Sequence, residues 1–215
     1  PDWGDLRAQS PEAVVVEVDA AGWDAAAARD GGTPNSLFVA LTVAVARPST
    51  PVQVSVPVDR RADPDSPANA VDMVAVTVAP GDSPAAVRAA LREAYAQPPM
   101  TSPAGFPPEL LQLVSDRAAH RLAPNPGERD VLCSNIGAIP DALSSLGGHR
   151  TSGIATRAVH PGVTPTQAAA ARNRLSAYLC RREGRYTLAL VSMDGGLRER
   201  TEEALAAHGL RARYW

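Results

Sequence analysis

The sequence contains no lysine, so every basic residue is an arginine. This absence excludes a Schiff-base lysine and a P-loop of the GKS or GKT type, because both need an amine. Cysteine is also scarce: Cys133 and Cys180 are too few for a disulfide framework. Each lies in an apolar, strand-like stretch. We therefore expect two buried free thiols in a reducing compartment, which points to the cytoplasm.

Long apolar runs and a strong net charge are missing too. The longest apolar run, Leu37 to Ala46, is interrupted by Thr42 and falls well short of the about 20 residues of a membrane span. A formal net charge of -2 provides no electrostatic footprint for nucleic acid. No signal peptide is recognisable. The chain begins at Pro1 without a methionine, so we expect a segment upstream of it.

The usual catalytic and metal-binding patterns are absent as well. The histidines are scattered, and no pair has the spacing of metal ligands on a helix. No serine stands in a G-x-S-x-G turn, and no glycine pattern is typical of a phosphate loop. Neither cysteine has a neighbouring histidine that could activate it. We therefore assign no catalytic residue and no metal site to this chain. The histidines are His120, His149, His160 and His208.

What is present is a chain of 215 residues, 45% hydrophobic, with clear helix and strand periodicities. A helix should begin at Pro34 because Thr33 is a good N-cap and proline suits the first helical position. Glu183-Gly184 predicts a hairpin turn, and Gly209 the end of the last helix. Pro57 favours an edge or a strand end. Strands are expected at 13–18, 52–58, 71–78, 130–135, 175–181, 185–191, 210–215 and, more weakly, 151–160; helices are expected at 23–29, 34–46, 84–97, 109–122 and 197–208.

The order of these elements predicts the fold class. Strands do not alternate strictly with helices, so a doubly wound parallel sheet is disfavoured. We expect an α/β protein, a layered α/β sandwich with a mixed β-sheet. The region 98–108 contains five prolines and should form a connector within an otherwise single unit spanning 1–215.

Four segments carry a resemblance to a known superfamily. They are GTPNSLFVALTVAVA (Gly32 to Ala46), VQVSVPVDRR (Val52 to Arg61), NAVDMVAVTVAP (Asn69 to Pro80) and VLCSNIGAIP (Val131 to Pro140). In this order they resemble the C-terminal half of the chloramphenicol acetyltransferase-like acyltransferases. That superfamily includes the condensation domains of peptide synthetases and the wax ester synthase/diacylglycerol acyltransferases. The resemblance implies one lobe of a two-lobed fold and covers roughly Val14 to Asp194.

The matching motifs are short and depart from the family pattern at two positions. Asn35 begins a motif in which Ser36 stands where the family has Asp. Pro57-Val58-Asp59-Arg60 resembles the family's PV-x-x-R strand end. Asn135-Ile136-Gly137-Ala138 resembles its N-x-x-G-P stretch, with Ala138 in place of Pro.

The resemblance also implies how such a lobe would work. The family's catalytic motif, His-His-x-x-x-Asp-Gly, belongs to the N-terminal lobe and is absent from this chain. Its histidine would act as general base on a hydroxyl or amine acceptor, which attacks an acyl thioester. The co-substrate would be acyl-CoA or a carrier protein's phosphopantetheine thioester. The partner would be an N-terminal lobe, in the same polypeptide or in a cleaved chain.

Two pairs of residues are candidates for the site, each with a plainer alternative. Ser134 and Asn135 could line the substrate channel and bond an acyl carbonyl or oxyanion, or satisfy backbone groups at a strand end. Arg60 and Arg61 could contact a phosphate, or form ion pairs with nearby aspartates. The nearby aspartates are Asp59, Asp63 and Asp65.

Two other functions stay open. The chain could be a non-catalytic acyltransferase-like module that binds a carrier protein or makes peripheral contact with lipid; the departures at Ser36 and Ala138 motivate this reading. It could also be an unrelated α/β protein without a two-lobed channel. An intact or broken catalytic motif upstream would distinguish the enzyme from the module.

Overall fold

The computed structural model describes residues 11–61, 71–97, 118, 129–157 and 171–215. The predicted connector at 98–108, the predicted helix at 109–122 apart from Ala118, and both His120 and His160 lie outside the described residues. The main elements are β1 (Glu12–Asp19), α1 (Ala20–Arg29), α2 (Pro34–Ala46), β2 (Val52–Asp59), β3 (Val71–Val78), α3 (Pro84–Ala96), β4 (Val131–Ala138), β7 (Leu175–Arg182), β8 (Arg185–Ser192), α6 (Leu197–Ala207) and β9 (Ala212–Tyr214).

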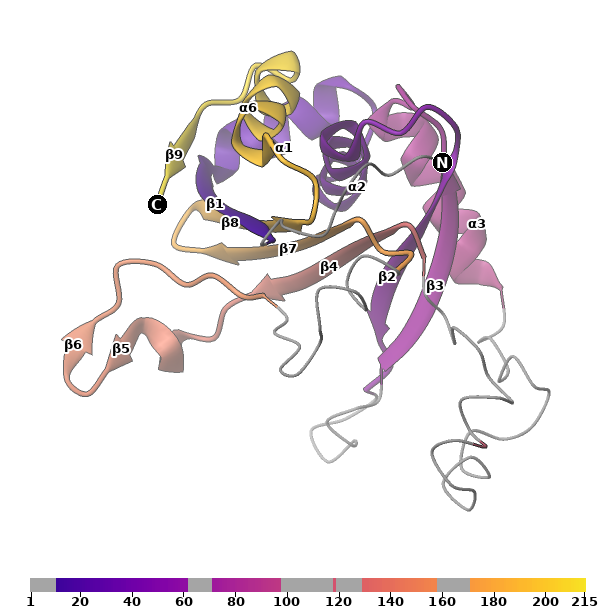
Figure 1. Ribbon diagram of the computed structural model, residues 1–215. Coiled ribbons are helices and arrows are strands. Elements are labelled where there is room, and N and C mark those ends of the chain that lie inside the picture. Colours follow the sequence, from indigo (N-terminus) through magenta and orange to yellow (C-terminus); the bar gives the residue numbers. More distant parts are fainter. Residues whose placement is uncertain (1–10, 62–70, 98–117, 119–128, 158–170) are drawn as a thin grey trace.

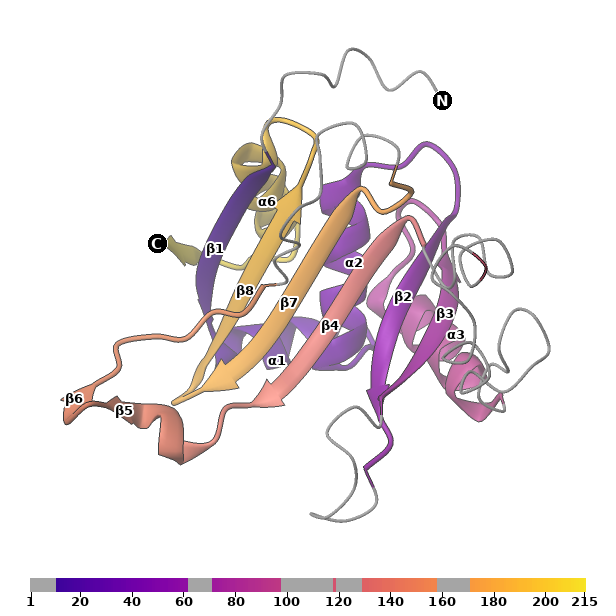
Figure 2. The same ribbon diagram turned by 60° about the horizontal axis from the view of Figure 1, so that its bottom comes forward.

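The strands form one mixed sheet of seven strands in the order β3-β2-β4-β7-β8-β1-β9. The central strand β4 runs parallel to β2 and β7, and the other pairs are antiparallel. The helices α1, α2, α3 and α6 lie together on one face of the sheet (Figure 1). Among the described residues no helix covers the opposite face (Figure 2). The prediction of a layered α/β fold with a mixed sheet is confirmed.

The helix α2 forms the centre of the helical layer. It begins at Pro34 as expected, and Thr33 and Ser36 form a capping box in which each side chain accepts a hydrogen bond from the other's backbone N–H. Its apolar side chains are buried on nearly all sides because it packs against α1, α3, α6 and the sheet. The N-terminus of α2 is thereby held in one position, which matters for the site.

The hairpin between β7 and β8 also matches its prediction. Glu183 and Gly184 both have positive φ, 46° and 76°, as a two-residue primed turn requires.

Pro57 was expected at a sheet edge or a strand end. The structure places β2 between β3 and β4, so β2 is not an edge strand. However, β4 pairs with β2 only at Val54 and Ser55. Pro57 lies beyond that pairing, where its missing N–H costs no ladder bond.

The predicted strand at 151–160 is wrong for its described part, because residues 151–157 have no regular secondary structure. Side chains from β7 hold this segment: Arg182 donates to the Thr151 carbonyl, 3.0 Å away, and the Cys180 thiol to the Ile154 carbonyl at 3.4 Å. These bonds replace a strand ladder. A small hairpin precedes it, formed by β5 (Ser145–Leu146) and β6 (His149–Arg150) after a 3-10 helix at Asp141–Ser144.

Candidate functional site

Three polar side chains from distant parts of the chain meet at one end of the sheet. Asn135 of β4 donates through Nδ2 to Oδ1 of Asn35, at 3.0 Å, although 100 residues separate the two. Asn35, in the first turn of α2, donates through its own Nδ2 to the hydroxyl of Tyr95, at 3.3 Å. Tyr95 comes from the last turn of α3. We call these three residues the amide cluster.

The position of the cluster follows from the sheet. Asn135 lies near the carboxyl end of β4, the strand that is parallel to both of its neighbours. Ligands in α/β proteins bind preferentially at the carboxyl ends of parallel strands. A register shift between Asn135 and Gly137, with φ of 80° at Gly137, marks a bulge in β4. Such bulges re-aim side chains near functional sites. Here the Gly137 N–H donates to Oδ1 of Asn135, which leaves Nδ2 directed at Asn35.

The amide cluster presents hydrogen-bond donors at the surface. Each amide nitrogen carries a second N–H beyond the one used inside the cluster, and the Tyr95 hydroxyl accepts from Asn35 while keeping its own proton. Partial burial raises the pKa of Tyr95, so the phenol stays protonated at neutral pH. Tyr95 is 38% exposed. The arrangement can therefore donate to a carbonyl or to a developing oxyanion.

The two neighbouring candidates on β4 lie on opposite faces of the sheet. Asn135 is opposite Leu179 of the core, so its side chain lies on the helical face. Ser134 is opposite Tyr178 and lies on the face that carries no described helix. The structure therefore brings Asn135 into the amide cluster and leaves Ser134 outside it.

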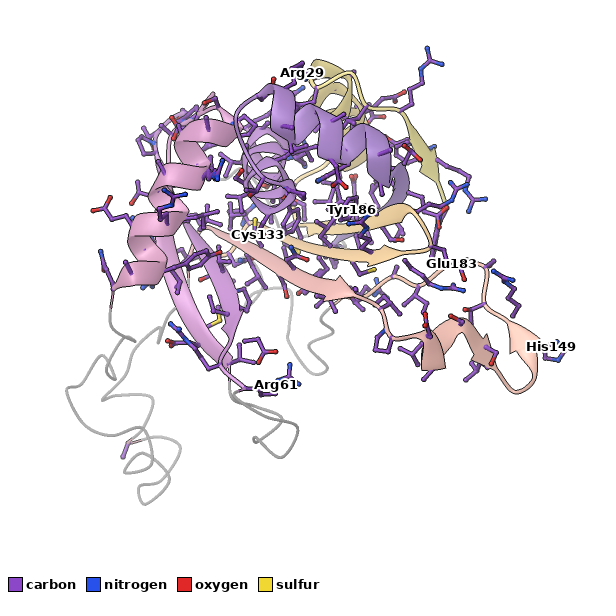
Figure 3. All side chains as sticks on the ribbon, turned by 180° about the vertical axis from the view of Figure 1, so that it is seen from behind. Arg29, Arg61, Cys133, His149, Glu183 and Tyr186 are labelled. Atoms are coloured by element: carbon purple, nitrogen blue, oxygen red, sulfur yellow. The ribbon has the colours of Figure 1, made fainter. Side chains whose placement is uncertain are left out.

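The two arginine candidates lie at the carboxyl end of β2, the strand next to β4, and Figure 3 shows Arg61 at this end. Arg60 forms an ion pair with Asp72, at 3.4 Å, and Arg61 with Asp59, at 2.8 Å. Hydrogen bonds from Arg61 lower the pKa of Asp59. Asp63 and Asp65 lie outside the described residues. Contact between these arginines and a phosphate stays a prediction.

Cys133 lies in the core between the sheet and the helices (Figure 3). It precedes Asn135 by two residues on the same face of β4 and is fully buried. Burial raises the pKa of its thiol to about 12, and a hydrogen bond with the Thr42 side chain offsets only part of that rise. Cys180 is buried as well, and both thiols are free, as expected. Only the thiolate form of cysteine is a nucleophile, and the Cys133 thiol stays protonated at neutral pH. Cys133 therefore has a structural role here.

We expect the Cys133 thiol to resist labelling in the folded protein. Burial keeps the reagent away from this thiol and raises its pKa to about 12, so at pH 8 its reaction with Ellman's reagent should be at least about 100-fold slower than that of free cysteine. Denaturant should release both thiols. Cys133→Ala identifies the contribution of each thiol in the titration. Rapid labelling of Cys133 in the native protein would contradict its burial.

Two residues of the cluster were not among the predicted site residues: Asn35, which was noted only as the start of a motif, and Tyr95. The spacing of Tyr95 from Val87 and Leu91 predicts an inward-facing position, yet only Val87 and Leu91 are buried. The signal that could have found it is the hydroxyl. A tyrosine at the end of an apolar stripe packs its ring on the protein and needs a partner for its oxygen.

The described residues hold no group of three or more side chains that could ligate a metal ion. A cavity of about 650 Å³ is present, but it lies near the other ends of α2 and α3. Its rim includes Asp30, whose pKa is lowered by Arg29 first and then by His208. This cavity is separate from the amide cluster, and the geometry of the cluster carries the functional argument. No helix in the described residues is long and apolar enough to cross a membrane.

Comparisons with known proteins locate the fold. No protein-family model and no curated protein sequence matches the chain. Three solved structures resemble it: the nonribosomal peptide synthetase FmoA3 (TM-score 0.58, 19% identity, 94% of this chain and 23% of that one); the wax ester synthase/diacylglycerol acyltransferase from Marinobacter aquaeolei VT8 (0.52, 12%, 95% and 52%); and the X-domain in complex with OxyB from teicoplanin biosynthesis (0.52, 18%, 93% and 46%).

These similarities concern the fold alone, since every identity is low. The chain spans between about a quarter and half of the length of these three proteins. The predicted resemblance is confirmed at the level of the fold, which the chain shares with part of a nonribosomal peptide synthetase and part of a wax ester synthase/diacylglycerol acyltransferase.

Proposed function

We propose that this chain is the C-terminal lobe of an acyltransferase that moves an acyl group from a CoA or carrier-protein thioester to a hydroxyl or amine acceptor. The observation that carries the proposal is the contact between Asn35 and Asn135. These residues begin two of the three motifs that resemble the family pattern, and the fold brings them together in the carboxyl half of β4, beside its bulge. The fold shared with a wax ester synthase/diacylglycerol acyltransferase supports the same reading.

In this proposal the chain supplies donors and an N-terminal lobe supplies the base. The base removes the proton from the acceptor as its oxygen or nitrogen attacks the thioester carbonyl. The new bond to carbon leaves an oxyanion, which the second N–H groups of the Asn135 and Asn35 amides stabilise. The C–S bond then breaks and the thiolate leaves, taking up a proton. Arg60 and Arg61, at the end of the neighbouring strand, would contact the phosphate of CoA or phosphopantetheine.

Binding of an acyl thioester tests which residues line the substrate wall. With octanoyl-CoA as the probe, Asn135→Ala should weaken binding by about 5- to 10-fold, the loss of one hydrogen bond to a polar ligand group. Ser134→Ala is the matched control, because it lies next in sequence on the opposite face of the sheet. Isothermal titration calorimetry measures both. The reverse pattern would move the site to the other face, and no effect from either variant would refute the proposed wall.

A second candidate is a non-catalytic module that binds a carrier protein or lipid. The specific observation is Ser36, which stands where the family has Asp and is buried within the capping box of α2. A structural neighbour was itself solved in complex with another protein, OxyB. Thiol release from acyl-CoA by the natural full-length polypeptide separates the candidates. Turnover supports the enzyme, and binding without turnover supports the module.

A further inference from the structure

The outer edge of β3 has no partner within the described part of the chain. β3 is the first strand in the sheet order and pairs with β2 along all eight of its residues, without a register shift. Its other edge faces away from the sheet (Figure 2). A strand edge of this kind presents backbone N–H and C=O groups that can pair with another strand.

Hydrogen bonds show which backbone N–H groups of β3 point away from β2. The Gln53 N–H donates to Asp130, 2.8 Å away, and therefore points away from β3. Gln53 is directly opposite Thr77, so the pair is not hydrogen-bonded and the Thr77 N–H also points away from β2. Because the direction of the N–H group alternates along a strand, the N–H groups of Met73 and Ala75 also point away from β2.

Two carboxylates occupy the ends of this outward row. The Met73 N–H donates to Oδ1 of Asp72 at 3.0 Å, and the Ala79 N–H to Oδ2 of Asp82 at 2.8 Å. Both contacts agree with the alternation. Between them, the N–H groups of Ala75 and Thr77 have no partner in the described residues. This inner stretch has no proline, no basic residue and no bulge, the devices that usually protect an edge.

We propose that β3 pairs antiparallel with β3 of a second copy of this chain, about a two-fold axis at Val76. In this register Ala75 lies opposite Thr77 of the second copy, and each such pair exchanges both of its hydrogen bonds. The N–H groups of Ala75 and Thr77, which have no partner in the described residues of a single copy, then each form a hydrogen bond. The two sheets become one continuous sheet with the helices of both copies on the same face.

The occupant is a second copy because the edge is complementary to itself. Val74 lies opposite Val78, and Val76 opposite its own counterpart, so apolar residues face apolar residues. Asp72 lies opposite Pro80, beyond the paired stretch, so no two carboxylates face each other. Like charges directly opposite would oppose such pairing.

Thr77→Pro tests the pairing without breaking the sheet of the single copy. Proline removes the outward N–H of Thr77, which β2 does not use. Thr77→Val is the matched control, since both substitutions lose the hydrogen bond from Gln53 to the Thr77 hydroxyl, but valine keeps the N–H. By sedimentation equilibrium the wild type and the valine variant should dimerise, and proline should raise the dissociation constant at least about tenfold. Circular dichroism and thermal melting check that the proline variant is folded.

A monomeric wild type at its highest soluble concentration would overturn the proposal, and so would undiminished dimerisation of the folded proline variant. If the proline variant does not fold, cross-linking decides. Chains with Ala75→Cys mixed with chains with Thr77→Cys should form a disulfide-linked pair under mild oxidation, and neither variant alone should do so. Equal yields from the mixture and from either variant alone would refute the register.

Discussion

Replacing Trp23 with alanine should lower the free energy of unfolding by about 3–5 kcal/mol, the range for a buried tryptophan. Trp23 is fully buried in the helical layer. Its ring centroid lies 5.4 Å from that of Tyr186 on β8, and its Nε1 donates to the carbonyl of Pro34, 3.1 Å away. The side chain thus joins α1 to the sheet and to the start of α2. Alanine would leave both a cavity and a lost hydrogen bond.

Urea denaturation followed by circular dichroism measures this loss. Trp215→Ala is the control, because Trp215 is 54% exposed at the end of the chain and should change the stability by less than about 1 kcal/mol. Equal effects of the two substitutions would contradict the packing described for α1 and α2. Trp23→Phe keeps most of the ring and removes the bond to Pro34. Because Asn35 follows Pro34, this variant should also weaken binding of octanoyl-CoA.

Local chemistry made part of this fold predictable. α2 was predicted with correct ends because Thr33 and Pro34 mark its start and its side chains are apolar on all sides. The β7–β8 hairpin was predicted because Glu183-Gly184 suits a turn with positive φ at both positions. Such signals come from neighbouring residues and do not depend on the rest of the chain.

The remaining features depend on contacts between distant residues. Nothing near Asn35 indicates that Asn135 contacts it, because the contact requires β4 to lie between β2 and β7. Likewise, the apolar pattern after Thr151 favours a strand, yet side chains of β7 hold residues 151–154 in an irregular path. The resemblance to a known fold identified the motifs, and the three-dimensional arrangement was needed to join them.

A second large effect is expected at Arg200, whose burial could not be predicted from the sequence. Its side chain lies in α6 and donates to three backbone carbonyls: Val45 at 2.8 Å, Asp194 at 2.8 Å and Gly196 at 3.3 Å. Val45 belongs to the last turn of α2, where carbonyl groups lack helical partners and a positive charge is favourable. The guanidinium therefore joins the end of α2 to the start of α6.

Arg200→Met should destabilise the protein by about 3 kcal/mol, because it keeps the apolar stem but leaves buried carbonyls without a charged donor. For a chain of this size that loss lowers the melting temperature by about 6–12 °C. Arg198→Met is the control on the same helix; Arg198 lies over the Tyr214 ring at 4.1 Å, a contact at an exposed site worth about 0.5–1 kcal/mol. Calorimetric melting of both variants compares them. Equal shifts in melting temperature would mean that the three carbonyl contacts of Arg200 contribute no more than one surface contact. A larger shift for Arg200→Met supports the view that α2 is fixed at both ends, at its start by Trp23 and at its end by Arg200.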